Sequence, residues 1–163
     1  MGIYITDYFS PIGKIVLGSD GSALVGLWTE GQKYFLGIYN EVETNDSLEI
    51  FKETKKWLDE YFKGNNPKIT MPLKPEGTQF QQKVWKELSK IPYGEAVTYG
   101  YIAKSLGIKS GQAVGGAVGR NPISIIIPCH RVVGSNNQLT GFAGGLDKKL
   151  RLLKLENKDI KIK

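Results

Sequence analysis

The sequence of 163 residues predicts an α/β protein of the α+β kind. A small N-terminal antiparallel sheet with a helix is expected first, followed by a mostly helical C-terminal domain that contains a helix-turn-helix. Three observations predict this arrangement. Short apolar runs separated by turn residues fill the start of the chain, a proline-rich stretch spans 64–77, and capped helical patterns follow it. We therefore expect two domains, residues 1–72 and 73–163.

Strands and one helix account for the first domain. Asp20-Gly21 lies between two apolar runs, which is typical of a β-hairpin. A helix is expected from about Asp46 to Lys63, with Asp46 and Glu49 as its N-terminal capping pair. Its hydrophobic pattern supports a scaffold and shows no candidate site, and its role stays open. The expected strands are 3–9, 14–19 and 23–28.

Three helices expected in the second domain each begin after a Ser or Thr whose hydroxyl can cap the helix N-terminus. A further helix is expected from about Leu146 to Glu156, after a glycine-containing loop. The second and third capped helices are short and joined by a tight turn, which is the helix-turn-helix pattern. The three capped helices follow Thr78, Thr98 and Ser110, and they end near Pro92, Leu106 and Arg120 respectively.

The helix expected after Ser110 has an unusual composition. Four of the nine residues 111–119 are glycine, and each disfavours a helix by roughly 1 kcal/mol relative to alanine. A helix that reads bases in the major groove carries several Arg, Asn or Gln side chains, whereas this one has only Gln112. A smooth helix of this kind suits the minor groove. Close helix–helix packing through Ala and Gly is the other interpretation, and the two are compatible on opposite faces of the helix.

Charge is distributed unevenly along the chain. Residues 1–77 hold 8 Lys and Arg against 11 Asp and Glu, a net charge of −3, whereas residues 78–163 hold 14 against 5, a net charge of +9. An acidic half joined to a basic half indicates that the second half faces a polyanion, most simply nucleic acid. A merely solvated basic surface is the alternative.

Cys129 and His130 are the only cysteine and the only histidine, and they are neighbours. Ile125–Ile127 and Pro128 precede them, which indicates the end of a buried strand. A thiol flanked by an imidazole and by the Arg131 guanidinium lies in an electropositive setting that lowers a cysteine pKa and favours a nucleophile. A cysteine packed as a small apolar residue is the alternative, and the polar His-Arg pair argues against it.

Several classes of protein are excluded by the same counts. One cysteine cannot form an internal disulfide, and one cysteine with one histidine cannot form the usual four-ligand zinc site. We expect no metal, no cofactor and no membrane span. The free thiol indicates a reducing compartment, which predicts a cytoplasmic protein.

Six short motifs carry a resemblance to a known family. They are Ser10–Gly13, Pro92–Glu95, Thr98–Gly100, Asn121-Pro122, Pro128–Val132 and Gly144–Leu146. Together they resemble the O6-alkylguanine-DNA alkyltransferases, also called methylated-DNA–protein-cysteine methyltransferases. The resemblance covers the whole second half, whereas the first half shares only its turn and its strand–helix layout.

The resemblance implies a suicide DNA-repair protein that flips a damaged guanine and takes its alkyl group irreversibly. It implies that Cys129 is the acceptor, that His130 is its base through a water, and that Glu156 is the far end of this relay. Asn121 is implied to support the turn between helix and nucleophile. Tyr99 is implied to assist flipping and to protonate the departing guanine.

The implied partner is double-stranded DNA containing O6-alkylguanine, bound through the minor groove by a monomer in a bacterial or archaeal cytoplasm. Whether O4-alkylthymine is also accepted stays open. Gln112 stands where relatives commonly carry arginine to fill the gap left by the flipped base, and Phe142 stands where they often carry tyrosine. The implied base-pocket and DNA-contact residues are Gln112, Ala113, Arg120, Val132, Ser135, Phe142 and Ala143.

Three other functions are compatible with parts of the sequence. A non-enzymatic protein that binds alkylated DNA would need no acceptor, but this chain keeps its cysteine. A cysteine hydrolase would need a histidine from elsewhere in the chain, and none is present. A plain helix-turn-helix regulator is disfavoured by the Gly/Ala helix, because that helix offers few base-reading side chains.

Overall fold

A four-stranded mixed sheet forms the N-terminal part of the chain in the computed structural model, which describes residues 2–163. Its order is β3-β2-β1-β4. The three predicted strands are confirmed and pair antiparallel. The sheet is not wholly antiparallel, because β4 pairs parallel to β1. All residues of β4 are exposed, so no apolar pattern marks this strand in the sequence. The strands are β1 (Gly2–Ser10), β2 (Gly13–Ser19), β3 (Leu24–Thr29) and β4 (Glu41–Thr44).

Helix α1 (Glu49–Phe62) packs against β1 and β2 through a buried face that includes Phe51 and Leu58. The predicted cap at Asp46 is wrong. The N-cap residue is Leu48, which makes no side-chain cap, and Asp46 instead accepts a hydrogen bond of 2.6 Å from the Thr6 hydroxyl of β1. A contact with a residue 40 positions away in the chain has displaced the local cap.

The predicted helices of the C-terminal part are confirmed. The side chains of Thr78, Thr98 and Ser110 each accept a hydrogen bond from the backbone N–H three residues later, at 3.1, 3.0 and 3.1 Å. Thr78 and Gln81 complete a capping box. Local chemistry therefore starts all three helices, as expected. The helices are α2 (Gln79–Leu88), α3 (Tyr99–Ser105), α4 (Gly111–Gly119) and α5 (Leu146–Glu156).

The predicted buried strand before Cys129 is wrong. Residues 123–127 are buried, but they form a tight turn in which the Ile127 N–H donates to the Ile123 carbonyl at 3.0 Å. Ile125 has a φ of 73°, which is unfavourable for a β-branched residue. A short apolar run does not distinguish a strand from a buried turn. The elements that follow are the 3₁₀ helix η1 (Cys129–Arg131), β6 (Val132–Val133), which pairs parallel to β5 (Val97–Thr98), and the 3₁₀ helix η2 (Ser135–Asn137).

The outer edge of β3 joins the two parts of the molecule. Near one end, Leu24 donates to the Pro72 carbonyl at 2.9 Å and accepts from the Lys74 N–H at 2.8 Å. Farther along, Leu27 donates to the Pro122 carbonyl at 2.8 Å and accepts from the Ser124 N–H at 3.2 Å. The sheet thus holds both the interdomain linker and the turn that leads to Cys129. The domain division at 72/73 falls in this linker and stays a prediction.

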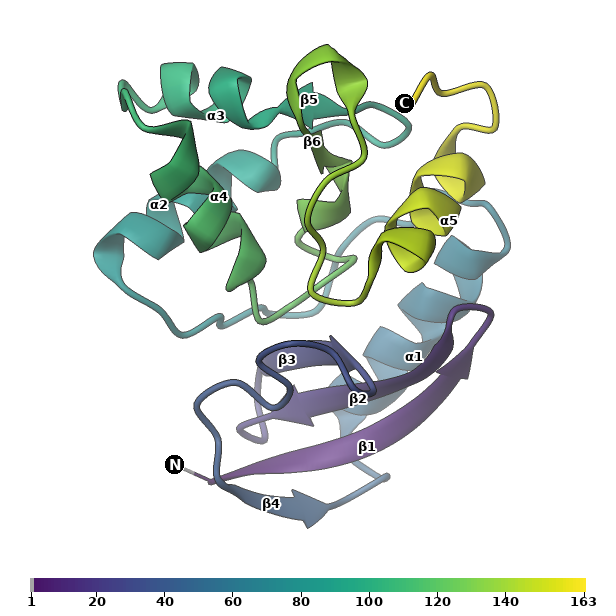
Figure 1. The fold of residues 1–163 in the computed structure, drawn as a ribbon. Coiled ribbons are helices and arrows are strands. Elements are labelled where there is room, and N and C mark those ends of the chain that lie inside the picture. Colours follow the sequence, from purple (N-terminus) through teal and green to yellow (C-terminus); the bar gives the residue numbers. More distant parts are fainter. Residues whose placement is uncertain (1) are drawn as a thin grey trace.

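Figure 1 shows the sheet at one end of the molecule and helices α2, α3 and α4 at the other. Helix α5 lies beside α1, so the last helix of the chain meets the only helix of the sheet domain. None of the helices in residues 2–163 combines the length and the apolar character that crossing a bilayer requires.

The capping box of α2 gives a first test. Thr78→Ala removes the side-chain oxygen that accepts from Gln81, so we expect the free energy of unfolding to fall by about 1 kcal/mol in urea denaturation. Thr78→Ser keeps the oxygen and is expected to lose only a small part of this. Equal losses in the two variants would show that the methyl group, rather than the cap, matters.

Candidate active site around Cys129

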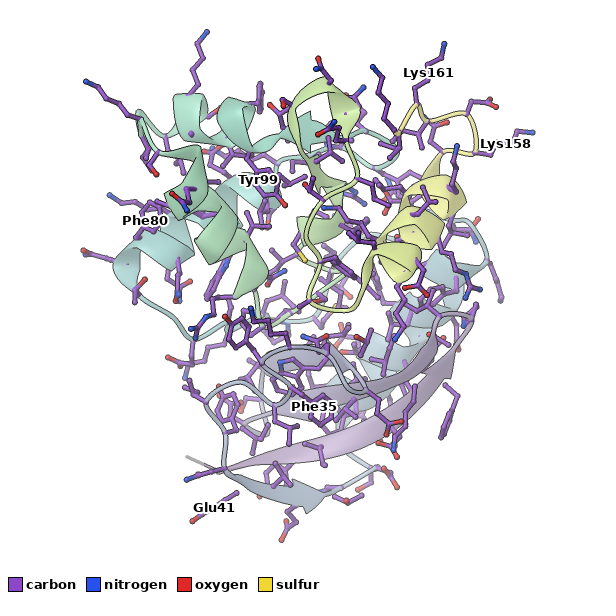
Figure 2. The ribbon with its side chains drawn as sticks, in the orientation of Figure 1. Phe35, Glu41, Phe80, Tyr99, Lys158 and Lys161 are labelled. Atoms are coloured by element: carbon purple, nitrogen blue, oxygen red, sulfur yellow. The ribbon has the colours of Figure 1, made fainter. Side chains whose placement is uncertain are left out.

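The Cys129 thiol lies at the floor of a cavity of about 340 Å³. Cys129 is 6% exposed and begins the 3₁₀ helix η1. Tyr99, Asn121, Phe142 and Ala143, four residues singled out in the sequence, line this cavity with the thiol. Figure 2 places Tyr99 in the interior of the C-terminal domain, whereas Lys158 and Lys161 extend outward. The cavity is within the size range of small-molecule sites.

His130, the residue after Cys129, forms a buried pair with Glu156. The distance from His130 Nε2 to Glu156 Oε2 is 2.6 Å, and neither side chain has exposed surface. Burial lowers the pKa of His130 although Glu156 opposes this, so the imidazole is neutral near pH 7. Because the carboxylate can only accept, Nε2 carries the proton of the neutral ring. The other ring nitrogen, Nδ1, is then a free acceptor.

That second nitrogen is the buried atom most suited to accept a proton. His130 Nδ1 has no hydrogen-bond partner among the described residues, and it belongs to the residue directly after the thiol. A buried imidazole nitrogen without a partner lowers the stability of the folded protein, so its presence here points to a functional role. The pair can therefore take a proton at Nδ1 and stabilise the resulting imidazolium through Glu156.

Glu156 is held by donors from several parts of the chain. Burial by itself raises its pKa, but the hydrogen bonds and charges of His130 and Arg131 outweigh this and hold the pKa well below its usual range. Arg131 donates through Nε at 2.8 Å to Oε1 and through Nη2 at 3.1 Å to Oε2. The Gly94 N–H donates to Oε1 at 3.1 Å, and the Tyr61 hydroxyl donates to Oε2 at 2.6 Å.

The predicted lowering of the Cys129 pKa is wrong. Burial raises the pKa of this thiol, while hydrogen bonds from Asn121 and Ser124 and the charge of Lys149 reduce the rise. The Arg131 guanidinium, which the sequence suggested as an activating charge, is occupied by Glu156. The resting cysteine is thus a neutral thiol, which needs a base to become a nucleophile.

Asn121 holds the turn that delivers the thiol. Its side-chain Nδ2 donates to the Ile127 carbonyl at 2.8 Å, and its Oδ1 accepts from the Ile123 N–H at 3.0 Å. One amide therefore closes the turn from both ends and compensates backbone groups that would otherwise be buried without partners. The same side chain contacts the Cys129 thiol.

Lys149 is a site residue that the sequence analysis missed. Its ammonium is buried and donates to the carbonyls of Thr140 and Gly141, at 2.5 and 3.1 Å. Burial lowers the pKa of Lys149 to about 8. These contacts anchor the loop that carries Phe142. Helical spacing in the sequence could have identified Lys149 as buried. It lies one turn before Leu152 and Leu153 and two turns before Glu156, and all four residues share the buried face of α5.

The first domain, whose role the sequence leaves open, contributes two residues to the cavity. Lys33 and Tyr34, in the loop after β3, line the cavity that contains the thiol. The Lys33 N–H donates to the Ala143 carbonyl at 3.2 Å, and the Arg120 guanidinium lies 4.0 Å from the centre of the Tyr34 ring. Nothing in the sequence of this loop indicates such contacts, because they depend on how the two domains pack.

The remaining predicted residues are not part of the cavity wall. Gln112 and Ala113 are exposed in the first turn of α4, and Ser135 is exposed in η2. Val132 is fully buried and pairs with Val97 in the small parallel ladder. Within residues 2–163, no group of three or more His, Cys, Asp or Glu side chains could hold a metal ion.

Two family models match successive parts of the chain. The 6-O-methylguanine DNA methyltransferase ribonuclease-like domain matches residues 3–75, and the DNA-binding domain of the same family matches residues 79–158. Among curated proteins, the methylated-DNA–protein-cysteine methyltransferase of Methanosarcina acetivorans is 47% identical, over 94% of this chain and 98% of its own length. That of Haemophilus influenzae is 44% identical, over 94% and 86%.

Solved structures agree with these matches. The crystal structure of Mycobacterium tuberculosis OGT in complex with DNA has a TM-score of 0.86 and 39% identity, and the alignment covers 97% of this chain and 94% of that one. The O6-methylguanine DNA methyltransferase of Methanococcus jannaschii has a TM-score of 0.64 and 34% identity, over 91% and 90%. The similarity therefore includes both domains.

Glu156→Gln tests the buried charge network. Because the pKa of Glu156 lies below its ordinary value of 4.5, its contribution to stability is present above that pH and declines as the pH falls further. We expect the variant to lose about 3 kcal/mol of unfolding free energy at neutral pH in urea denaturation. The difference in unfolding free energy from wild type is expected to become smaller below pH 4.5.

Glu60→Gln is the control for this variant. Glu60 is an exposed carboxylate paired with Lys63, so we expect its loss to change stability little. If the difference in unfolding free energy between wild type and Glu156→Gln stayed constant below pH 4.5, the explanation through an ionised Glu156 would be wrong.

Proposed function

The chain belongs to the O6-methylguanine DNA methyltransferase family and reverses O6-alkylguanine damage directly, as a methylated-DNA–protein-cysteine methyltransferase; we propose that Cys129 is its acceptor. The observation that carries this proposal is that Cys129 lines the cavity and is followed directly by His130, whose imidazole is paired with the buried Glu156. Transfer to Cys129 is irreversible and occurs once per molecule, because the thioether product is stable.

The proposed transfer balances in protons and electrons. The Cys129 thiol gives its proton through a water to His130 Nδ1, and Glu156 stabilises the imidazolium. The thiolate attacks the alkyl carbon, the S–C bond forms, and the bond from that carbon to O6 breaks with its electron pair left on guanine. Burial raises the pKa of Tyr99, so its phenol is protonated and supplies the proton that the departing guanine takes up. The Tyr99 phenolate then takes a proton from water, and the His130 imidazolium returns its proton to water.

The proposed DNA contact is the minor groove, read by α4. Side chains added at Gly111, Gly116 or Gly119 would meet nothing within 4 Å. A Cβ added at the fourth glycine, Gly115, would be in ordinary contact with the Tyr99 ring at 3.9 Å. Three of the four glycines are therefore not needed for packing of the protein against itself.

The larger side chains of α4, Val114 and Val118, are buried together with Ala117. The outer face of α4 is therefore smooth and narrow. A narrow face fits a groove that excludes bulk.

Several finer assignments accompany this proposal. Phe142 and the Ala143 amide form the wall of the base pocket, and Gln112 lies at the position that fills the gap left by the flipped base. The protein acts as a monomer, because one thiol and one cavity suffice for a single transfer. A cytoplasmic location fits the free thiol and the bacterial and archaeal relatives.

Mass spectrometry after incubation with duplex DNA carrying one O6-methylguanine tests the acceptor. We expect the mass of one methyl group on the tryptic peptide Asn121–Arg131, placed on Cys129 by fragmentation, and saturation at one per protein. Cys129→Ser is expected to bind the DNA without gaining mass. Unmodified wild-type protein that still bound the DNA would instead indicate a damage-sensing role.

Gln112→Arg tests base extrusion. An arginine at this exposed position brings a charge and a longer reach into the gap, so we expect methyl transfer from duplex DNA to be about 5-fold faster in single-turnover kinetics. Gln112→Met, which has similar length but no hydrogen bond, is expected to be slower than wild type. An equal acceleration by arginine on single-stranded substrate would contradict the gap-filling explanation.

A further inference from the structure

We propose that Tyr61, in helix α1 of the sheet domain, is a positioning residue of the proton relay. Its hydroxyl donates to the carboxylate of Glu156 and thereby sets how strongly Glu156 attracts the proton of His130. This inference rests on the proposed role of His130 as the base. It gives the sheet domain a chemical part in the transfer, in addition to its role as a scaffold.

The geometry of Tyr61 is specific to this contact. Its hydroxyl is 2.6 Å from Glu156 Oε2 and 3.5 Å from His130 Nε2, and the side chain is 1% exposed. Tyr61 and His130 therefore share one carboxylate oxygen. The two hydrogen-bonded residues, Tyr61 and Glu156, are 95 positions apart in the sequence.

Packing holds the Tyr61 ring in place. The ring stacks on Trp57 with centroids 5.3 Å apart and an interplanar angle of 10°. Its edges meet Phe62 and Tyr93 at centroid distances of 5.3 and 6.3 Å. Because the ring is packed on several sides, removal of its hydroxyl is expected to leave the ring where it is. The hydroxyl can thus be tested separately from the packing.

Glu156 has more donors than its two oxygens have lone pairs. Oε2 accepts from His130, Tyr61 and Arg131, and Oε1 accepts from Arg131 and the Gly94 N–H. A carboxylate offers about four lone-pair sites, so these donors compete for its charge. The titratable and charged groups that face the His130–Glu156 pair are Tyr61 from α1, Tyr93 from the loop after α2, Arg131 from η1, and Lys149 from α5.

The direction of the effect follows from this competition. A donor to Oε2 makes the carboxylate a weaker partner for the imidazolium, because it uses part of the same negative charge. Burial, with the nearby charge of Glu156, raises the pKa of Tyr61 well above its usual value, so the phenol stays protonated and remains a donor. Removal of the phenol hydroxyl therefore stabilises the protonated form of His130 and raises its pKa.

Nuclear magnetic resonance can measure this directly, because His130 is the only histidine. Untagged protein labelled with ¹⁵N-histidine would be titrated from about pH 4 to 9. We expect Tyr61→Phe to raise the His130 pKa by about one unit. The acid limb of the single-turnover rate of methyl transfer is expected to move to higher pH by a similar amount, because His130 must be neutral to accept the thiol proton.

Tyr93→Phe is the matched control. Tyr93 packs against Tyr61, but its hydroxyl donates to the Gly64 carbonyl at 3.1 Å instead of to Glu156. We expect this variant to leave both the His130 pKa and the rate profile unchanged. As a second probe, 3-fluorotyrosine placed at position 61 is a more acidic phenol and a stronger donor, so we expect it to lower the His130 pKa.

The outcomes separate the inference from the function on which it rests. If Tyr61→Phe lowered thermal stability but left the His130 pKa and the rate profile as in Tyr93→Phe, Tyr61 would be structural and the proposal overturned. If the His130 pKa rose while the rate profile did not move, the coupling of Tyr61 to His130 would be supported. The failure would then lie in the proposed role of His130 as the base.

Discussion

The buried carboxylate of Glu156 is the group on which the site depends. It accepts hydrogen bonds from α1, from the turn before β5 and from η1, and it lies itself on α5. A charge removed from water is stable only when partners compensate it, so these four segments must meet at one point. Their meeting orients His130 and joins the sheet domain to the site chemistry. The hydrogen bonds that hold these segments together therefore also hold His130, the residue after Cys129.

A second constraint places the thiol at the cavity. The segment after α4 pairs with the edge of β3 at Leu27, then turns sharply through Ile125 into the 3₁₀ helix that begins with Cys129. Asn121 closes this turn with hydrogen bonds at both ends. An edge strand with unpaired backbone groups is thus covered, and the same pairing sets the position of the Cys129 thiol. The sheet domain therefore helps to position the thiol, although most of the cavity wall comes from the second domain.

Predictions from the sequence succeeded where the deciding interaction is local. The caps at Thr78, Thr98 and Ser110 bond within three residues, so their helices were predicted with nearly the observed bounds. Predictions failed where a distant partner decides. Asp46 bonds to Thr6 instead of capping a helix, and the exposed strand β4 has no apolar pattern of its own. The turn before Cys129 was mistaken for a strand because both are short, buried and apolar.

The sequence by itself determined the family and the fold class, and it singled out the candidate site residues, because motifs such as Cys129-His130 are contiguous. Only the tertiary structure decided how these residues behave. It showed that burial raises the pKa of the thiol, and that Lys149 anchors the loop at the cavity. It also brought Tyr61 to Glu156. Solvent exclusion and contacts between distant segments set protonation and position, and neither is encoded by neighbouring residues alone.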